Sequence, residues 1–388
     1  MDDVVVLGVG MIPFGKHQNL SLYEMGRQAI WNAIQDADID PRVIGHAYVS
    51  NSLAGPLQGL ENTRGQFVMR EAGFSGIGVT NVENACASGT NAFRGACLEV
   101  ASGASDFALA VGVEKMLIGD NVRTLGAITA AASPLYASLG YQFTAGYAMK
   151  IKKYMAKYGL SREDIARVVV KNTYNGSLNP LAYQRTPRTL EEVLSARLVA
   201  DPLTLYMCCP NSDGAAAAIV CREKTARKLT SRLLPRVAAC SIGSGRLPGT
   251  GDTSISTTTM VARSAYEAAS IAPSDVNFVE LHDAMAPAEL IEIEELEVCQ
   301  PGEAALWLRE GVTELGGKVP VSPSGGLAAR GHPVGATGLA QIAELVWQLR
   351  GDAGERQVDG AKVGLALNQG GRVDTEEAAA YCVTILKR

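Results

Sequence analysis

Hydrophobic and polar positions follow two alternating patterns along the chain. Short runs rich in β-branched residues predict buried strands at residues 4–9, 43–50 and 106–113. Apolar positions three or four residues apart predict helices at residues 21–37 and 89–102. Because strands and helices alternate, we expect βα units around a mostly parallel sheet, which is an α/β fold.

The second half of the chain repeats this order of elements. The same criteria predict helices at residues 256–270 and 339–349, and strands at residues 236–242, 276–281, 362–367 and 378–386. Gly351 follows the last helix, as is typical of a C-cap. Since both halves run strand, helix, strand, loop, helix and strand, we interpret the chain as an internal structural duplication.

The middle of the chain, residues 117–203, differs from both halves. It is richer in Lys, Arg, Tyr and Pro and has fewer strand-like runs. Helices are predicted at residues 144–158 and from Ser161, where Ser-Arg-Glu-Asp forms a capping pattern, and a polar loop is predicted at residues 172–192. The basic side chains could hold an anionic cofactor or form a solvated lid, and both interpretations remain open.

A buried strand predicted at residues 211–220 returns the chain to its first half. We therefore expect three parts. They are an N-terminal half formed by residues 1–116 and 204–234, an inserted loop domain at residues 117–203, and a C-terminal half at residues 235–388.

Composition narrows the classes of protein to consider. Of 388 residues, 47% are hydrophobic and 19% are charged, which is enough apolar material for a large core. The formal net charge of −5 gives no indication of binding to nucleic acid or to an anionic membrane. No signal peptide, membrane-spanning run or peroxisomal address is visible, and the eight Cys residues show neither disulfide nor zinc spacing. These features predict a cytoplasmic protein with free thiols.

Cys86 is the first residue that suggests a chemistry. It lies in Glu-Asn-Ala-Cys-Ala-Ser-Gly at residues 83–89, directly before a predicted helix. Small neighbours leave the thiol accessible, and a helix N-terminus favours the thiolate, which is the nucleophilic form. A Cys in an Ala-rich stretch could equally be a small core residue.

Two histidines lie in distinctive motifs. His332 belongs to Gly-His-Pro-Val-Gly-Ala-Thr-Gly at residues 331–338, at the entrance to a predicted helix that can display its side chain. His282 begins His-Asp-Ala-Met directly after a predicted strand, and ligands of α/β proteins gather at the carboxyl ends of strands. The spacing of the four histidines does not indicate a metal site. An acidic series after His282 is interpreted as a solvated helix face; it comprises Glu289, Glu292, Glu294, Glu295 and Glu297.

Of two glycine-containing motifs, one is a candidate for oxyanion binding and the other is not a convincing nucleotide-binding loop. Asn368-Gln369-Gly370-Gly371 follows a predicted buried strand, and paired glycines allow backbone N–H groups to approach an oxyanion, although they also form ordinary turns. Gly8-Val9-Gly10 resembles a dinucleotide-binding loop only loosely. Its spacing differs from that motif and Pro13 interrupts a helix start, so an NAD enzyme is a remote alternative.

Together, the motifs around Cys86, His282, His332 and Asn211-Ser212-Asp213-Gly214 resemble those of the thiolase superfamily over nearly the whole chain. The His-Asp motif is similar to that of the sterol-carrier-protein-2-type and archaeal branches. The resemblance implies two βαβαβαββ halves that form a five-layer α-β-α-β-α core, with a loop domain inserted in the first half. It also implies a homodimer or homotetramer without metal or permanently bound cofactor, and coenzyme A thioesters as substrates.

The resemblance also implies roles for single residues. Cys86 would attack an acyl-CoA and carry the acyl group, and His332 would activate it. His282 would hold a water or complete one oxyanion hole. The backbone N–H groups of Cys86 and of Gly371, or its neighbour Gly370, would form the second oxyanion hole. The leading reaction is thiolytic cleavage or Claisen condensation of a 3-ketoacyl-CoA.

The chain departs from the family where a second thiol acts as acid and base. Asn368 replaces the Cys of the Cys-x-Gly-Gly-Gly motif and Arg372 replaces its third Gly, while Ala284 stands where the other branch has Cys in His-Asp-Cys-Phe. Asn cannot act as a base at neutral pH. Arg372 could pair with nearby Asp374 or Glu376 on the surface, or it could point towards the acyl pocket.

Three interpretations of this departure remain open. In the first, the chain is a thiolase in which His282, His332 or a loop thiol, Cys208 or Cys209, acts as the base. In the second, it performs acyl transfer or retro-aldol cleavage of an acyl-CoA together with a small OB-fold or zinc-ribbon partner protein. In the third, a remote alternative, it is a non-catalytic CoA-binding subunit.

Overall fold

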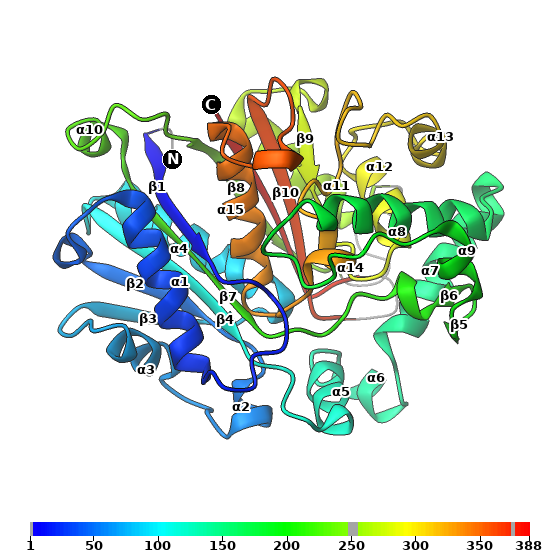
Figure 1. Cartoon of the computed structure of the whole chain (residues 1–388), viewed down its shortest axis with the longest axis horizontal. Helices are drawn as coiled ribbons and strands as arrows, with labels where there is room; N and C mark the ends of the chain where they lie inside the picture. The colour runs from blue at the N-terminus through cyan, green and yellow to red at the C-terminus, as the bar shows by residue number, and fades with distance from the viewer. Residues whose placement is uncertain (1–2, 247–254, 374–376) are drawn as a thin grey trace.

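The computed structural model describes residues 3–246, 255–373 and 377–388 (Figure 1). Nine of its strands form one mixed sheet in the order β3-β2-β4-β7-β1-β8-β11-β10-β9. Their bounds are β1 (Val4–Met11), β2 (His46–Ser50), β3 (Gly78–Val82), β4 (Phe107–Glu114), β7 (Gly214–Arg222), β8 (Arg236–Ser244), β9 (Phe278–Glu280), β10 (Val363–Gly370) and β11 (Ala380–Lys387).

The pairing of the strands confirms the predicted duplication. In the first half β1 is antiparallel to β7, β7 is antiparallel to β4, and β4 is parallel to β2. In the second half β8 is antiparallel to β11, β11 is antiparallel to β10, and β10 is parallel to β9. The two half-sheets are joined where β1 pairs with β8 through Val5 and Arg236.

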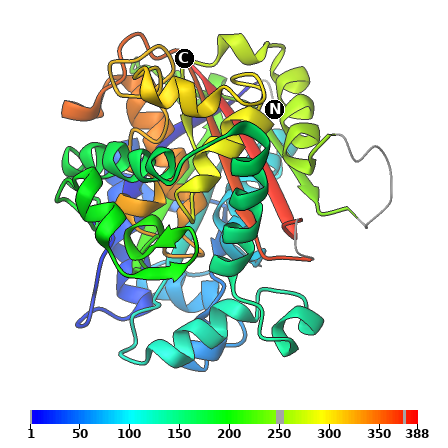
Figure 2. The ribbon, with the colours of Figure 1, turned by 90° about the vertical axis from the view of Figure 1, so that its right-hand side faces the viewer.

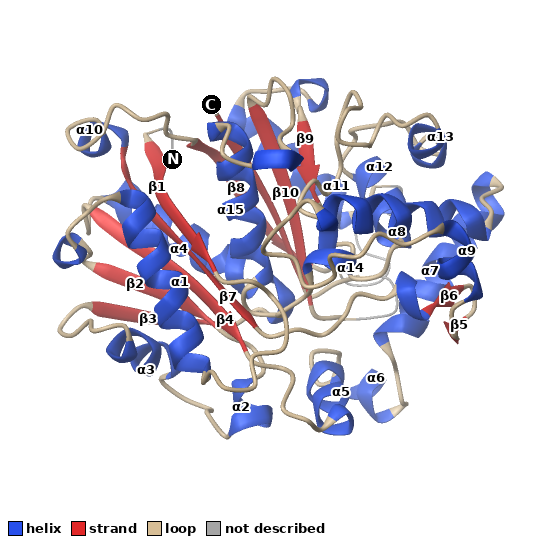
Figure 3. Ribbon diagram, viewed as in Figure 1, coloured by secondary structure: helices blue, strands red, loops and turns tan. Residues whose placement is uncertain are grey.

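Helices lie between and outside the half-sheets and complete the five predicted layers (Figure 3). Helices α4 (Ser88–Ser102) and α15 (Thr337–Arg350) share one apolar core with residues of both half-sheets. Helices α1 (Leu22–Ala37) and α3 (Arg64–Glu71) pack on the outer face of the first half-sheet. Helices α11 (Thr257–Ala269) and α12 (Pro287–Glu295) pack on the outer face of the second.

The two central helices meet at their N-terminal ends, where only small residues fit. A Cβ added to Gly338 would lie 2.5 Å from the backbone N of Thr90, and one added to Gly89 would lie 3.0 Å from the backbone N of Leu339. Because both helices begin at the same place, the loops that precede them, which carry Cys86 and His332, are also brought together.

The predicted middle segment forms a group of helices and two short strands beside the second half-sheet, on the face turned to the viewer in Figure 2. These are α5 (Asn121–Thr129), α6 (Pro134–Ser138), α7 (Phe143–Tyr158), α8 (Arg162–Ser177), α9 (Leu190–Ser195), β5 (Leu198–Ala200) and β6 (Leu203–Thr204). The capping box predicted at Ser161 is present, since Ser161 and Asp164 each accept the other's backbone N–H.

The prediction of a polar loop at residues 172–192 is wrong over its first third and its end. Helix α8 continues to Ser177, and its buried Asn175 donates to the carbonyl of Ser322. Buried Asn179 donates to the carbonyl of Ser324 in the same way. These amides are polar because they satisfy backbone groups of the second half, not because they face solvent.

Other predicted elements agree with the structure to within a few residues. Ser256 is the N-cap of α11 and Ser270 its left-handed C-cap, while residues 43–45 precede β2 rather than belong to it. Elements that the sequence did not predict include α3 and β3 of the first half and the short helices α2 (Ala54–Gln58), α10 (Glu223–Ala226), α13 (Ala304–Arg309) and α14 (Gly326–Arg330). Among the described residues, no helix has the length and apolar character needed to cross a membrane.

Candidate active site

Cys86 lies on a tight turn, Ala85–Ala87, directly before α4, as the sequence predicts. The Ser88 hydroxyl fixes this turn, because it accepts from the N–H of Asn84 and donates to the carbonyl of Ala85. The end of β10 supports the turn from the other half. A Cβ added to Gly370 would lie 2.2 Å from the carbonyl oxygen of Asn84, so only glycine allows this approach.

His332 faces Cys86 across the joint between the halves. Its Nε2 lies 3.2 Å from the Cys86 Sγ, and its Nδ1 lies 2.7 Å from the Thr337 hydroxyl. That hydroxyl donates to the carbonyl of Pro333, so we assign it as acceptor of the Nδ1–H. The Nε2 of His332 then carries a lone pair directed at the thiol, which is the arrangement of a general base.

His282 lies beside this pair and is oriented by Asn368. The ring centroids of His282 and His332 are 5.1 Å apart, and His282 Nδ1 lies 3.1 Å from the Asn368 side-chain nitrogen. The Thr90 hydroxyl donates to Asn368 Oδ1, which fixes the amide with its NH₂ group towards His282. Nδ1 is therefore an acceptor, and His282 keeps its proton on Nε2 as a hydrogen-bond donor.

Burial sets the protonation of the three groups. It lowers the pKa of His332 to about 3, with Arg330 adding to the effect, and it lowers the pKa of His282 well below its usual value. Burial also raises the pKa of Cys86 to about 12, and Glu114 adds to that rise. The N–H groups at the turn act in the expected direction and lower this pKa, but desolvation outweighs them.

Two backbone N–H groups face the thiol. Those of Cys86 itself and of Gly371 both hydrogen-bond to it and act to lower its pKa. Gly371 has a φ of 64°, which a residue with a Cβ rarely adopts. These are the two N–H donors that the sequence suggested for one oxyanion hole. The role of Gly370 is different, because it allows the end of β10 to approach the turn that carries Cys86.

The three side chains also form a compact cluster of metal-type ligands. The Sγ of Cys86 and one ring nitrogen each of His282 and His332 lie within 4.8 Å of one another. The spacing of the histidines along the chain did not indicate this cluster. A thiol and two imidazoles are ligand types that zinc accepts, so these three side chains suit either a zinc ion or the chemistry of an acyl group.

A pocket of about 390 Å³ opens in front of the thiol. Much of its lining is apolar, with Leu53, Met116, Ile128, Phe143, Met285 and Val334 among the residues. Cys208, Cys209 and Ala284 also line it, so both candidate loop thiols lie near the site, and Ala284 contributes no thiol. Burial raises the pKa of Cys209 well above its usual value, so Cys209 carries its proton at neutral pH.

Arg372 turns inwards rather than to the surface. Only 6% of it is exposed, and it lines the pocket that contains Cys86. Asp374 and Glu376, which the sequence suggested as surface partners, lie outside the described residues. Arg372 therefore lies towards the pocket, and its pairing with those two residues stays a prediction.

The prediction of a solvated acidic face after His282 is wrong for two of its residues. Glu289 and Glu292 are 1% and 2% exposed. Glu289 pairs with buried Lys171, and Glu292 accepts from the backbone N–H of His282 at 3.1 Å. Burial raises the pKa of both carboxyl groups, and Glu292 holds the strand end that carries His282.

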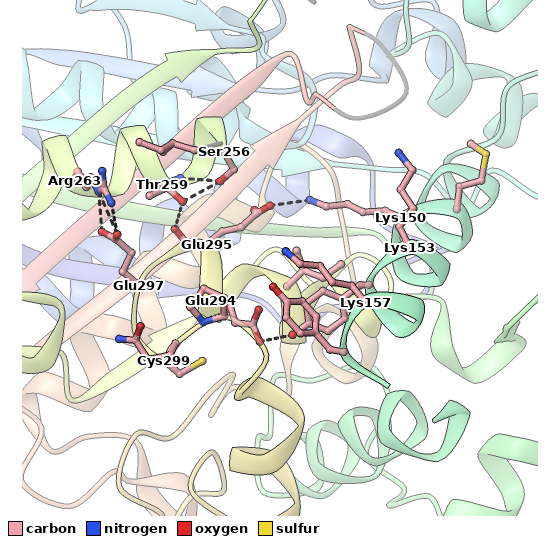
Figure 4. Close-up of a pocket in the computed structure, with 17 residues that line it drawn as sticks. Lys150, Lys153, Lys157, Ser256, Thr259, Arg263, Glu294, Glu295, Glu297 and Cys299 are labelled. Carbon is pink, nitrogen blue, oxygen red and sulfur yellow. Dashed lines mark hydrogen bonds and ion pairs between the residues drawn. The ribbon is translucent and has the colours of Figure 1, made fainter. Parts of the chain in front are cut away.

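The rest of that acidic series borders a second pocket, of about 740 Å³, between α7, α11 and α12 (Figure 4). These three acidic side chains bond within the protein. Glu295 lies 3.1 Å from Lys150, and Glu297 lies 2.6 Å from Arg263. Glu294 accepts from the Tyr154 hydroxyl. Cys86, His282 and His332 do not line this pocket.

Sequence reasoning missed several residues that position the site. Thr337 orients His332, and Thr90 orients Asn368, the partner of His282. Glu114 connects segments of the two halves. The Glu114 carboxylate accepts from the backbone N–H groups of Ser52, Leu53 and Gly335. Only Thr337 had a local signal, because it belongs to the His332 motif; the others act across distant parts of the chain.

Comparison with known proteins agrees with this architecture. The model of the family described as "Thiolase, N-terminal domain" matches residues 4–224, and "Thiolase C-terminal domain-like" matches residues 249–386. An acetyl-CoA acetyltransferase of Methanothermobacter thermautotrophicus is 41% identical over 96% of this chain and 97% of its own. The benzoylsuccinyl-CoA thiolase subunit BbsB of Thauera aromatica is 38% identical over 92% of this chain and 91% of its own.

Similarity extends to the sterol-carrier branch and to solved structures. Human sterol carrier protein 2 is 35% identical over 95% of this chain and 70% of its own. The structure titled "Ltp2-ChsH2(DUF35) aldolase" has a TM-score of 0.81 at 24% identity and covers 98% of this chain and 97% of its own. An acetyl-CoA acetyltransferase from Syntrophomonas wolfei has a TM-score of 0.72 at 19% identity, with 99% of each chain covered. Both structures share the fold.

The molecule is thus an enzyme of the thiolase-type acyltransferase class. The chain belongs to the thiolase superfamily, within its sterol-carrier-protein-2 and archaeal branch.

Proposed function

We propose that Cys86 takes up the acyl group of an acyl-CoA as a thioester. The observation that carries this proposal is the 3.2 Å contact between His332 Nε2 and the Cys86 thiol. His332 accepts the thiol proton as the sulfur attacks the thioester carbonyl. The carbon–sulfur bond to coenzyme A then breaks, and His332 returns the proton to the leaving thiol.

The donors around Cys86 support this step electrostatically. The N–H groups of Cys86 and Gly371 stabilise negative charge on one carbonyl oxygen, and removing such a donor typically costs about 10²–10³ in rate. His282 offers its Nε2–H to a second oxygen, either of a bound water or of the other thioester. Burial keeps both imidazoles neutral, so they exchange hydrogen bonds and protons without an initial charge.

For the second step, we favour thiolytic cleavage or Claisen condensation of a 3-ketoacyl-CoA. The names of the related acetyl-CoA acetyltransferases support this choice. Asn368 cannot exchange the required proton, so the acid or base is His282, His332 or Cys209. Cys209 is the candidate that lies in the pocket without a role in acylation, and it would act as a proton donor because its thiol is neutral.

A second candidate function rests on the missing thiol. Asn368 and Ala284 occupy both positions where relatives in the superfamily carry the second catalytic Cys. Acyl transfer or retro-aldol cleavage, with a small OB-fold or zinc-ribbon partner protein, needs no such thiol at these places. A relative that is itself named as a subunit fits this alternative. The contact between Cys86 and His332 speaks against a non-catalytic CoA-binding subunit.

The remaining parts of the proposal concern the whole molecule. Coenzyme A thioesters are the substrates, and no permanently bound cofactor is expected. Residues 117–203 act as a loop domain that covers coenzyme A, between an N-terminal half at residues 1–116 and 204–234 and a C-terminal half at residues 235–388. We also expect a cytoplasmic homodimer or homotetramer.

Incubation with acetyl-CoA followed by intact-mass analysis tests the acylation step. The wild-type chain should gain one acetyl group, and Cys86→Ala should gain none. No adduct on the wild type, or an adduct that persists in Cys86→Ala, contradicts the covalent mechanism.

Thiolysis of acetoacetyl-CoA with free coenzyme A then separates the two functions. Thiolysis supports the thiolase reaction, whereas acylation without thiolysis supports the alternative. If Cys209 supplies the proton, Cys209→Ala loses thiolysis and keeps acylation, while Cys208→Ala, a matched neighbour, keeps both.

A further inference from the structure

The cluster of Cys86, His282 and His332 has a capacity that the acylation chemistry does not require. Its three donor atoms, the Sγ of Cys86 and one ring nitrogen of each histidine, lie within 4.8 Å of one another. They come from three separate parts of the chain, which are the turn at residues 85–87, the segment after β9 and the loop after α14. A thiol and two imidazoles that converge in this way form the donor set of a zinc site with three protein ligands.

The spacing of the donors is close to that around a tetrahedral zinc ion. Zinc–sulfur bonds of about 2.3 Å and zinc–nitrogen bonds of about 2.0–2.1 Å place two donors about 3.3–3.6 Å apart. The Cys86 Sγ and the His332 Nε2 are already 3.2 Å apart. The longest separation in the cluster is at most 4.8 Å, so it has to shorten by no more than about 1.5 Å, which small side-chain rotations supply.

The contacts behind the two histidines suit metal ligation. A zinc-bound histidine commonly donates its other ring N–H to an oxygen atom. His332 meets this condition, since its Nδ1 lies 2.7 Å from the Thr337 hydroxyl. In His282 the Nδ1 is bonded to Asn368, so Nε2 is the nitrogen left for a ligand. Among the described residues, this Nε2 has no hydrogen-bond partner.

Ligation by His282 requires one local rearrangement. The ring proton moves from Nε2 to Nδ1, which then needs an acceptor. Turning the Asn368 amide over presents its Oδ1 to this N–H, and the Thr90 hydroxyl, which can accept as well as donate, then bonds the amide NH₂ group. The orientation of Asn368 is therefore coupled to the presence of the ion.

The pocket in front of Cys86 supplies an entry path and a fourth position. It has a volume of about 390 Å³ and is lined by all three side chains, so a water can complete the tetrahedron. The cluster offers sulfur and nitrogen donors, whereas Mg²⁺ and Ca²⁺ take oxygen ligands. The site should therefore select zinc over these two more abundant ions.

We propose that Cys86, His282 and His332 bind a zinc ion reversibly, and that the bound ion blocks acylation. On binding, the thiol proton of Cys86 passes to solvent, and the sulfur lone pair that would attack a thioester forms the zinc–sulfur bond instead. Because His332 Nε2 is occupied as well, neither the nucleophile nor its base is available. The ion is an inhibitor of the site and not a cofactor. Its binding rests on the geometry alone, and its effect on acylation rests on the proposed function.

Cobalt(II), which reports the ligands of zinc sites by its absorption, tests the identity of the donors. The probe is added to the reduced full-length chain after a chelator has removed bound metal. We expect a thiolate-to-cobalt band in the near ultraviolet and visible bands typical of tetrahedral geometry, both displaced by zinc. Cys86→Ser should lose the thiolate band. Cys208→Ser removes a thiol of the same pocket outside the cluster and should keep it.

Competition with a chromogenic chelator measures the zinc affinity. We expect His282→Gln and His332→Gln each to weaken zinc binding at least about 10²-fold, the upper end of the cost of losing an outer partner. Asn368→Asp should tighten it about tenfold, because a carboxylate accepts the other ring N–H of a zinc-bound histidine. His46→Gln is the control, since His46 bonds to Thr80 outside the cluster, and it should leave the affinity unchanged.

Protection of the thiol is measured on the wild type, so this readout does not depend on the folding of a variant. At a free zinc concentration about ten times the Kd, alkylation of Cys86 by iodoacetamide and its acylation by acetyl-CoA should both slow about tenfold. Chelation should restore both rates, and Mg²⁺ at the same concentration should change neither.

The outcomes that contradict the inference are distinct. A cobalt spectrum without a thiolate band, or equal zinc affinities in Cys86→Ser and the wild type, identifies an adventitious ion only and overturns it. Unchanged affinity in both histidine variants, or zinc bound without protection of Cys86, overturns it as well. No gain in Asn368→Asp removes His282 from the ligands. Failure of the metal-free chain to be acylated contradicts the proposed function, and the spectrum and affinities then still decide the inference.

Discussion

The side-chain nitrogen of Asn368 lies 3.1 Å from Nδ1 of His282 and donates a hydrogen bond to it. This contact makes Asn368 a positioning residue at a place where many members of the superfamily carry a reactive thiol. It directs the single proton of neutral His282 away from Asn368, onto Nε2.

Replacing Asn368 by Ala should release His282 from this orientation. We expect the rate of Cys86 acylation by acetyl-CoA to fall about tenfold or more, because a mispositioned oxyanion donor loses much of its effect. Asn277→Ala, which removes an amide at the edge of β10 instead, should keep the wild-type rate. Equal rates in Asn368→Ala and the wild type would exclude a positioning role.

Asn368→Cys should restore the missing acid and base. If only the second thiol limits the thiolase reaction, the ratio of thiolysis to acylation should rise by about 10² or more, the lower end of general acid–base effects. Thiolysis of acetoacetyl-CoA and the acylation rate are measured on the same preparation. An unchanged ratio would show that another group already supplies the proton.

Thr337→Val should disturb the base rather than the nucleophile. The variant removes the acceptor of the His332 Nδ1–H, so the imidazole loses the contact that presents its Nε2 lone pair to Cys86. We expect a loss of about tenfold or more in acylation rate, and a changed dependence of that rate on pH. Thr384→Val is the control, since Thr384 is equally buried but bonds to Cys240 instead. A wild-type rate and pH profile in Thr337→Val would contradict the assigned tautomer.

Alkylation of Cys86 by iodoacetamide should depend steeply on pH. The thiol pKa of about 12 and the His332 pKa of about 3 mean that both groups are neutral between these values. The thiolate fraction then rises about tenfold for each pH unit up to pH 9, and the alkylation rate should follow it. The rate is measured by mass spectrometry of the Cys86 peptide, with Cys86→Ala as the blank. A constant rate between pH 5 and 8 would instead indicate a thiolate–imidazolium pair.

Gly370→Ala should separate the two sides of the site. The added methyl group would lie 2.2 Å from the carbonyl oxygen of Asn84 and 2.7 Å from the backbone N of Ala87, so the end of β10 must move away from the nucleophile turn. We expect acylation to fall by about 10² or more, because Gly371 would carry its N–H away with it. Gly126→Ala is the matched control. Gly126 lies in α5 with nothing within 4 Å of an added Cβ, so the change should leave the rate intact and stabilise the helix by up to about 1 kcal/mol.

The fold was predictable because its signals are periodic and local. Hydrophobic spacing located α1, α4, α11 and α15 almost to their caps, and the repeated element order indicated the duplication that the strand pairing confirms. Errors arose where polar residues are buried. Asn175 and Glu292 have the sequence character of surface positions, but each satisfies a backbone group of another segment.

The sequence indicated three side chains that the structure brings together, but it did not indicate their electrostatics. Cys86, His282 and His332 each carry a motif, and the structure brings them within 4.8 Å of one another. The partnership of Thr90 with Asn368 spans 278 positions, so no local pattern can reveal it. The high pKa of Cys86 depends on how far the surrounding fold desolvates the thiol, which a helix start in the sequence does not encode.

The division of the site between the two halves has a consequence in genetics. Cys86 comes from the first half and both histidines come from the second, yet all three belong to one chain. An allele that lacks the thiol and an allele that lacks the imidazole therefore do not complement each other, however their products assemble. A polypeptide has a complete site only if its own gene encodes both the thiol and the imidazoles.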